Sequence, residues 1–293
     1  MMRKKHTIAY LIGFQWLLLS ACDIINPPEA IPAYIYVPGF EVNIPSSQGS
    51  ASTRITEVWL SVNDNFLGAY SLPALIPILE EGPQNITLEA GIKENGINAT
   101  PDIYPFYRPW EMRINLRPNE VDTLRPVVGY RNEARFAFIE PFENANHIFQ
   151  ELRAGTNFNR IQIVRENAFE GNSALIELNE DNPLVEIGTS RRFSDLTTRG
   201  FVVYMEMNYR SDVDVIFGVQ GYKNGLPGTA FFDPGFTARG DWNKIYFNMS
   251  PLFFGGDFDE FQILIQTLLP ANNGAFTKTK ASIWLDNIKL VHF

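Results

Sequence analysis

The chain has 293 residues, a formal net charge of −9 at pH 7 and a single cysteine. The acidic balance excludes binding of nucleic acid through neutralisation of its phosphate backbone, and the length accommodates one large domain or two ordinary ones. Aromatic side chains make up 13% of the residues, and 21 glycines and 19 prolines punctuate the chain, which favours β structure over helices.

The N-terminus has the layout of a secretory signal. Arg3, Lys4 and Lys5 precede a mostly apolar run over residues 7–19. This run is shorter than the roughly 20 apolar residues that a membrane-spanning helix requires. Small side chains precede Cys22, and polar residues and prolines follow it, a pattern typical of a tether rather than of a buried core.

The stretch Leu19-Ser20-Ala21-Cys22 resembles the bacterial lipobox, in which the cysteine is lipidated and becomes N-terminal. The resemblance implies a signal peptide over residues 1–21, a covalent lipid on Cys22 and a lipidated tether over residues 22–30. The acyl chains would hold the protein in the outer membrane, because two lipid signals already anchor stably. Surface-exported lipoproteins of the Bacteroidota often carry an acidic cluster after the cysteine. This tether has only two acidic residues, so its periplasmic and surface faces both remain open. The alternative is an ordinary signal peptide with an unrelated cysteine.

Residues 31–130 show apolar and polar side chains alternating with period two, which predicts a small antiparallel, Ig-like β-sandwich. The alternating runs are 55–62, 66–72, 84–92, 111–116 and 123–130. Within this block, residues 62–92 resemble the small PEGA-type β modules of bacterial envelope proteins. That resemblance implies a spacer or adhesion-like module rather than an enzyme.

A polar break, "GYRNEAR" at 129–135, marks the predicted start of a second domain over residues 133–293. "GFVVYMEMNY" places Val203, Met205 and Met207 on one face, and the sequence predicts one buried and one solvent-exposed face, as in a β-sandwich. Nine strands are predicted, over residues 135–142, 160–166, 173–179, 183–188, 200–209, 213–221, 241–249, 260–269 and 281–291.

The second domain resembles the jelly-roll domains of carbohydrate-binding modules and the galactose-binding-like fold. The resemblance is carried by "FIEPFEN" (138–144), "FEGNSALIEL" (169–178), "DWNKIYFNM" (241–249) and "WLDNIKLV" (284–291). It implies an all-β jelly-roll sandwich after the smaller β domain. Position 141 is proline where the family commonly has aspartate.

Many such modules hold a structural Ca²⁺ between the first and last strands, bound by carboxylate, amide and carbonyl oxygens. By motif, the resemblance implies Glu143, Glu170, Asn172 and Asp286 as its ligands. The alternative is that these side chains are solvated polar groups at strand ends.

The loop "PDIYPFYRPWE" (101–111) places four aromatic residues among three prolines, and these residues are Tyr104, Phe106, Tyr107 and Trp110. Prolines oppose a regular central strand, and rings on a stiff loop make good contact residues for a sugar or a protein. The alternative is that the loop folds back and plugs the end of its sandwich. Two further aromatic loops, 230–236 and 251–256, carry the same pair of interpretations.

The sequence contains no nucleophile-elbow or zinc-protease motif, and Cys22 is its only thiol. An acidic stretch, "GDFDEF" (256–261), must be considered for glycoside hydrolysis, but it lacks a leading glutamate and follows two glycines. It is better explained as a loop.

We therefore expect no catalysis. The leading hypothesis is a lipid-anchored envelope protein that binds glycan or a partner protein. The alternatives are a structural subunit of an outer-membrane assembly and, third, a glycosidase.

Overall fold

The computed structural model describes residues 29–152, 160–198, 200–254 and 256–293. Cys22 and the signal segment lie outside these ranges. Within them the fold is all-β, apart from two short 3₁₀ turns, η1 (Ser46–Gln48) and η2 (Ser250–Phe253). The described residues form no helix that is long and apolar enough to cross a bilayer.

The N-terminal domain packs two sheets around an aliphatic core that includes Ile35, Leu60, Ile76 and Leu88. The larger sheet is ordered β4 (Asn65–Ser71), β3 (Glu57–Val62), β6 (Gly82–Lys93), β7 (Pro101–Ile103), with β8 (Trp110–Leu116) also paired to β6. The second sheet is ordered β5 (Ala74–Ile78), β1 (Ala33–Val37), β9 (Val121–Thr123), and a small pair joins β2 (Glu41–Val42) to β10 (Val127–Val128).

Two features of this domain differ from the sequence prediction. The β1–β9 and β2–β10 pairs are parallel, so the sandwich is not wholly antiparallel. Strand β5, which contains Pro77, is not among the runs predicted from alternation. It lies at a sheet edge, where Pro77 stands opposite Tyr34 of β1 and a missing backbone N–H can be tolerated.

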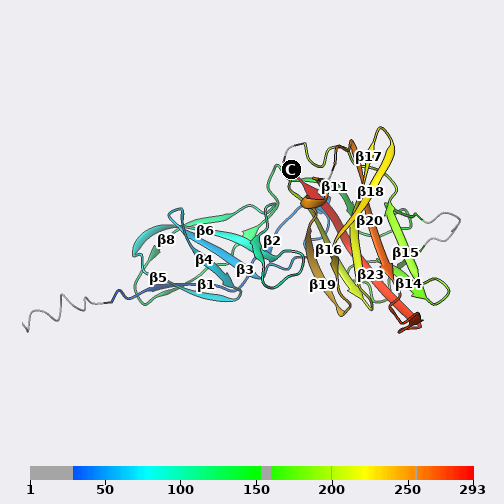
Figure 1. The fold of residues 1–293 in the computed structure, drawn as a ribbon. Coiled ribbons are helices and arrows are strands. Elements are labelled where there is room, and N and C mark those ends of the chain that lie inside the picture. The colour runs from blue at the N-terminus through cyan, green and yellow to red at the C-terminus, as the bar shows by residue number, and fades with distance from the viewer. Residues whose placement is uncertain (1–28, 153–159, 199, 255) are drawn as a thin grey trace, which may run out of the picture.

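The C-terminal domain is a sandwich of two antiparallel sheets (Figure 1). The first is ordered β13 (Ile161–Val164), β14 (Ser173–Asn179), β23 (Lys280–His292), β16 (Val203–Ser211), β19 (Arg239–Asn248), and β11 (Arg135–Glu140) pairs with β23. The second is ordered β12 (Phe149–Glu151), β15 (Leu184–Thr189), β20 (Glu260–Leu268), β17 (Val215–Lys223), β18 (Leu226–Phe236). A short hairpin joins β21 (Ala271–Asn272) to β22 (Ala275–Phe276). One continuous apolar cluster fills the space between the two larger sheets.

Strand β16 is buried on both faces, whereas the sequence predicted one solvent-exposed face. Met205 and Met207 enter the core of the sandwich as expected. On the opposite face, Tyr204 packs in a second cluster formed by both domains, and Glu206 is fully buried. The reason is that the N-terminal domain covers this side of the β16–β19 sheet (Figure 1).

The aromatic loop 101–111 lies in this contact between domains, which corrects its prediction as an exposed ligand surface. Tyr104 and Phe106 are 0% exposed and Tyr107 is 3% exposed. Their rings pack against Tyr204 and other residues of the C-terminal domain, and Trp110 is half-buried between the N-terminal core and the interdomain cluster. Buried rings cannot stack on a ligand from solvent, so the loop joins the domains, a role that neither sequence interpretation included.

A buried ionic network crosses the same contact. The hydroxyls of Tyr104 and Tyr130 each donate to Glu206 Oε1 at 2.6 Å, and Lys244 Nζ lies 3.0 Å from Oε2. Lys289 Nζ donates to the backbone oxygen of Ser50 at 2.7 Å. Burial by itself raises the pKa of Glu206, but the two lysines and the tyrosine hydrogen bonds outweigh it and hold this pKa below its ordinary value. Burial lowers the pKa of Lys289 to about 8, against the opposing attraction of Glu206.

Candidate functional site

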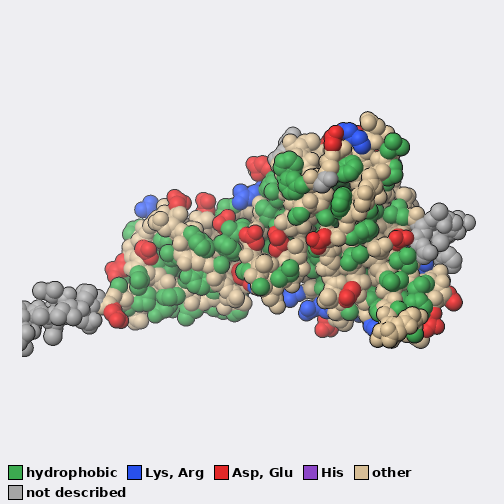
Figure 2. Space-filling model, viewed as in Figure 1, with side chains coloured by type: hydrophobic (Ala, Val, Ile, Leu, Met, Phe, Trp, Pro, Cys, Tyr) green, Lys and Arg blue, Asp and Glu red, His purple; other side chains and the backbone are tan. Residues whose placement is uncertain are grey.

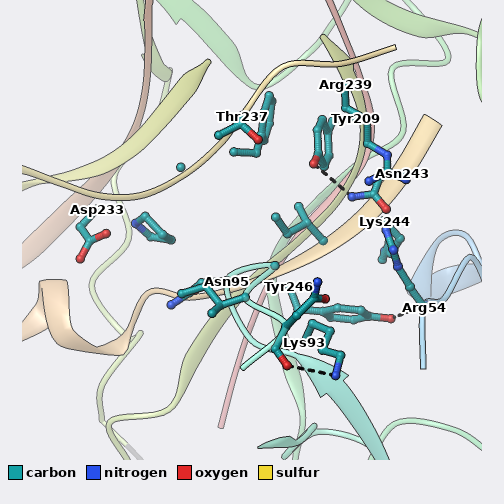
Figure 3. A pocket seen from close by; sticks show the side chains of 17 residues that line it. Arg54, Lys93, Asn95, Tyr209, Asp233, Thr237, Arg239, Asn243, Lys244 and Tyr246 are labelled. Atoms are coloured by element: carbon teal, nitrogen blue, oxygen red, sulfur yellow. Dashed lines mark hydrogen bonds between the residues drawn. The ribbon is translucent and has the colours of Figure 1, made fainter. Parts of the chain in front are cut away.

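A hollow with a volume of about 610 Å³ lies at the domain junction. One wall is the turn at 93–98, which follows β6 of the N-terminal domain. The other wall comes from the ends of β18 and β19 in the C-terminal domain (Figure 3). The wall residues that matter below are Arg54, Lys93, Asp233, Arg239, Asn243 and Lys244.

A second hollow of about 330 Å³ adjoins the first. The two share Arg54, Arg239, Asn243 and Lys244 as lining residues, and together we call them the junction groove. The second hollow adds an aromatic pair and a buried amide, and these residues are Phe169, Trp242 and Asn208. The groove exists only where the two domains meet, because each contributes part of its lining.

The junction groove is basic although the chain is acidic overall. Lys93 is paired with Glu57, and Lys244 is paired with Glu206, so two of its four cations are neutralised within the protein. The side chains of the other two, Arg54 and Arg239, are exposed and form no ion pair with any residue that the structure describes. Both arginines are therefore available to an external partner.

Trp242 provides a half-buried ring in the second hollow. On β19, Trp242, Lys244 and Tyr246 alternate with the core residues Ile245 and Phe247, so they share the face toward the N-terminal domain. The ring of Trp242 contacts the ring of Phe169, with centroids 5.5 Å apart, and its Nε1 donates to the backbone oxygen of Asn167 at 3.1 Å. These two contacts fix the ring in place before any ligand arrives.

Asn208 lines the same hollow and is 1% exposed. Its Nδ2 donates to Ser52 Oγ at 2.9 Å, whereas its Oδ1 has no hydrogen-bond partner among the described residues. A buried carbonyl oxygen without a donor costs about 1–3 kcal/mol. Because this oxygen is itself buried, a ligand hydroxyl would satisfy it once the Asn208 side chain turns toward the hollow.

The residues predicted for calcium meet in two hydrogen-bonded pairs in the C-terminal domain. Asn172 Nδ2 donates to the backbone oxygen of Glu143 at 3.0 Å and to its Oε2 at 3.4 Å. The backbone N–H of Glu170 donates to Asp286 Oδ2 at 3.1 Å, and Ser173 Oγ donates to the same atom at 2.8 Å. Burial raises the pKa of Asp286 to about 6 against these hydrogen bonds. The described residues include no group of three or more acidic, histidine or cysteine side chains arranged to hold a metal.

The acidic loop at 256–261 is neutralised locally. Lys223 Nζ lies 2.9 Å from Asp257 Oδ1 and 2.8 Å from Asp259 Oδ1, and the backbone N–H of Asn224 donates to Asp259 Oδ2 at 2.9 Å. The hydrogen bond from Lys223 holds the pKa of Asp259 below its ordinary value. A general acid needs the opposite shift, so Asp259 is not suited to that role.

The groove residues Arg54, Asn208, Arg239 and Trp242 were not identified from the sequence as site residues. A signal existed for Trp242, because its alternation with Ile245 and Phe247 on β19 places it on the face away from the core. No local pattern signals that Arg54 and Arg239 line one groove, since they lie in different domains.

No protein-family model matches the sequence, and no curated protein matches it. Solved structures do resemble the chain. A carbohydrate-binding module of the β-sandwich superfamily is 13% identical and has a TM-score of 0.37, covering 80% of this chain and 84% of that one. A family 30 carbohydrate-binding module of a Clostridium thermocellum cellulosomal cellulase is 13% identical, with a TM-score of 0.37 and coverage of 54% and 96%. A family 29 carbohydrate-binding module from Piromyces equi is 15% identical, with a TM-score of 0.36 and coverage of 55% and 92%. These similarities concern the fold alone and assign no ligand to this chain.

Proposed function

We propose that the protein is a non-catalytic cell-envelope protein, anchored in the outer membrane through lipid on Cys22, that binds a glycan in the junction groove. The observation that carries the proposal is the second hollow, where the fixed ring of Trp242 lies with the buried, unpartnered oxygen of Asn208. The location in the envelope rests on the lipobox resemblance, which lies outside the described residues.

Sugars suit this combination of groups. The ring of a sugar has an apolar C–H face that packs on an aromatic side chain, while its hydroxyls donate and accept hydrogen bonds at the edge. Trp242 supplies the aromatic surface, and Asn208 Oδ1 supplies a desolvated acceptor. Because Phe169 and Asn167 already hold the indole in place, little conformational entropy is lost when the ligand binds.

Binding without hydrolysis fits the charges of the groove. Glycosidases use a pair of carboxyl groups on either side of the scissile bond. Among the described residues that line the junction groove, Asp233 is the only one with a carboxylate. It lines the larger hollow but not the second one.

A protein partner is the second candidate, and one observation favours it. Exposed apolar side chains lie on the hairpin of β17 and β18, where Leu226 is 72% exposed and Ile216, Phe231 and Phe232 are also exposed. Hydrophobic side chains reach the surface around these strands in Figure 2. Such a surface suits a structural subunit of an outer-membrane assembly.

The test of glycan binding is retention of the full-length, detergent-solubilised protein on a panel of immobilised polysaccharides. Trp242→Ala should weaken binding about 30-fold, the effect of losing a central aromatic contact. Trp59→Ala is the matched control, because Trp59 is half-buried in the N-terminal domain, stacks on Phe66 and does not line the groove. Wild-type protein that binds no polysaccharide, or a Trp242→Ala variant that binds as tightly as wild type, would refute the proposal.

A further inference from the structure

Arg54 and Arg239 are separated by most of the chain, yet both line both hollows of the junction groove. Arg54 lies in the segment before β3, in the N-terminal domain, and Arg239 is the first residue of β19. Figure 3 shows their side chains on the same side of the larger hollow, with Asp233 on the other side. The fold therefore brings two guanidinium groups from different domains to one place.

These two arginines carry the uncompensated positive charge of the groove. The other cations of its lining are neutralised, Lys93 by Glu57 and Lys244 by Glu206. The backbone N–H of Arg54 is used by the protein, since it donates to Tyr246 Oη at 3.1 Å, but its guanidinium is not. On a chain with a net charge of −9, this local excess of cations selects for an anionic group.

We infer that the ligand of the groove is an acidic glycan, and that Arg54 and Arg239 bind the carboxylate or sulfate group of one of its sugars. This inference rests on the proposed glycan-binding function and names its substrate class. A guanidinium presents its N–H groups in a planar fork that matches the paired oxygens of a carboxylate or a sulfate ester. A neutral sugar would offer these two exposed guanidinium groups no charged partner.

The second hollow gives each part of such a ligand a defined neighbour. The sugar ring packs on Trp242 and the anionic substituent contacts Arg54 and Arg239, all of which line this one hollow. A hydroxyl of the sugar donates to the buried Asn208 Oδ1 once that side chain turns toward the hollow. Its adjoining larger hollow, of about 610 Å³, accommodates a neighbouring sugar of the same chain. The charge then sets specificity, and the charge and the ring contact both contribute affinity.

The experiment compares matched acidic and neutral polysaccharides with the full-length protein. Polygalacturonate supplies carboxylates, dextran sulfate supplies sulfate esters, and galactan and dextran are the uncharged counterparts. Binding should be at least tenfold tighter for one acidic polymer than for its neutral counterpart, and the preferred polymer identifies which anion is bound. Tighter or equal binding of the neutral counterparts overturns the inference while leaving glycan binding intact.

Arginine variants distinguish specific binding at the groove from nonspecific electrostatic attraction to an acidic polymer. Arg54→Gln and Arg239→Gln should each weaken binding of the preferred acidic polymer roughly tenfold or more, because each removes a charge-assisted hydrogen bond. Both variants should leave any weak binding to the neutral polymer unchanged. Arg125→Gln is the control, since Arg125 is exposed in the N-terminal domain away from the groove. An equal loss in Arg125→Gln, or no loss in the two groove variants, overturns the inference. Loss of all polysaccharide binding in Trp242→Ala, with the arginine variants unaffected, supports glycan binding and overturns the acidic specificity.

Discussion

Glu206 and Lys244 lie 3.0 Å apart in the contact between the two domains, with 0% and 3% of their side chains exposed. Glu206 is on β16 and Lys244 is on the adjacent strand β19, so one sheet supplies both charges. The N-terminal domain completes the site, since it covers the pair and donates two tyrosine hydroxyls to Glu206. The N-terminal domain thus removes two charged side chains of the C-terminal domain from water.

Removing the anion of this pair should strongly destabilise the protein. Glu206→Gln leaves Lys244 and Lys289 buried without an acid, and an uncompensated buried charge costs about 3–5 kcal/mol. We expect a loss of that size in the free energy of unfolding, measured by urea denaturation. Glu111→Gln, on an exposed position of β8, should stay within about 0.5 kcal/mol of wild type. Similar stability of the two variants would show that the network contributes little.

Lys289 should make stability rise with pH in the alkaline range. Its pKa is lowered to about 8 in the folded protein, chiefly by burial, while an unfolded lysine titrates near 10.4. Between these values the unfolded chain binds more protons than the folded one, so this group's contribution to the free energy of unfolding increases with pH. The cost of burying the charged amine is complete below pH 8 and is relieved above it.

The comparison uses wild type and Lys289→Met in urea at pH 8 and pH 9.5. The wild-type stability relative to the variant should increase by up to about 2 kcal/mol over this interval, at about 1.4 kcal/mol per pH unit. Other groups titrate alike in both proteins and cancel from the difference. A constant difference, or one that shrinks as pH rises, contradicts the lowered pKa.

Residues 133–293 should fold without the N-terminal domain. Every member of the large apolar cluster between the two C-terminal sheets lies within this range, from Phe138 to Leu290. The fragment would also expose Tyr204 and Tyr246 and leave Glu206 without its tyrosine partner from the aromatic loop. We therefore expect a cooperative thermal transition at a lower temperature than that of the whole protein. A gradual melt with dye binding from low temperature would mean that the two domains form one folding unit.

Calcium binding stays a prediction that melting curves can decide. Asn172 is hydrogen-bonded to Glu143, and Glu170 to Asp286. Calcium binding to the folded state would raise its stability by about 2.7 kcal/mol at 100 times the dissociation constant. Full-length protein should melt at a higher temperature in millimolar calcium than in chelator. Glu143→Gln should lose that increment, whereas Glu177→Gln, on β14 facing solvent, should keep it. Identical melts with calcium and chelator would leave these side chains a purely structural role.

Replacing Cys22 with serine should release the protein from membranes, because serine has no thiol to accept the lipid and residues 7–19 are too short to span a bilayer. Cell fractionation followed by a carbonate wash measures the release. A serine variant that remains in the washed membrane pellet would rule out lipid attachment at this cysteine.

The all-β fold could be predicted from the sequence because period-two alternation is local, as on β14, β20 and β23. Two kinds of structural feature could not be predicted from the sequence. Strands β5 and β18 contain prolines that local rules oppose, and both are edge strands of their sheets, a position that only the complete sheet defines. The burial of Glu206 and of the aromatic loop depends on domain docking, which alternation cannot reveal. The same limit explains why Arg54 and Arg239 were missed, since their shared groove is a product of tertiary structure.

The parallel pairing of β1 with β9, and its antiparallel pairing with β5, has a mechanical consequence. In Figure 1 the chain enters β1 at the end of the N-terminal domain that lies away from the domain junction. A protein tethered at that end and pulled by a polymer held at the groove would carry tension lengthwise through β1. The ladder hydrogen bonds on both sides of β1 would then be sheared together rather than opened one after another, so the N-terminal domain would resist stretching as a unit.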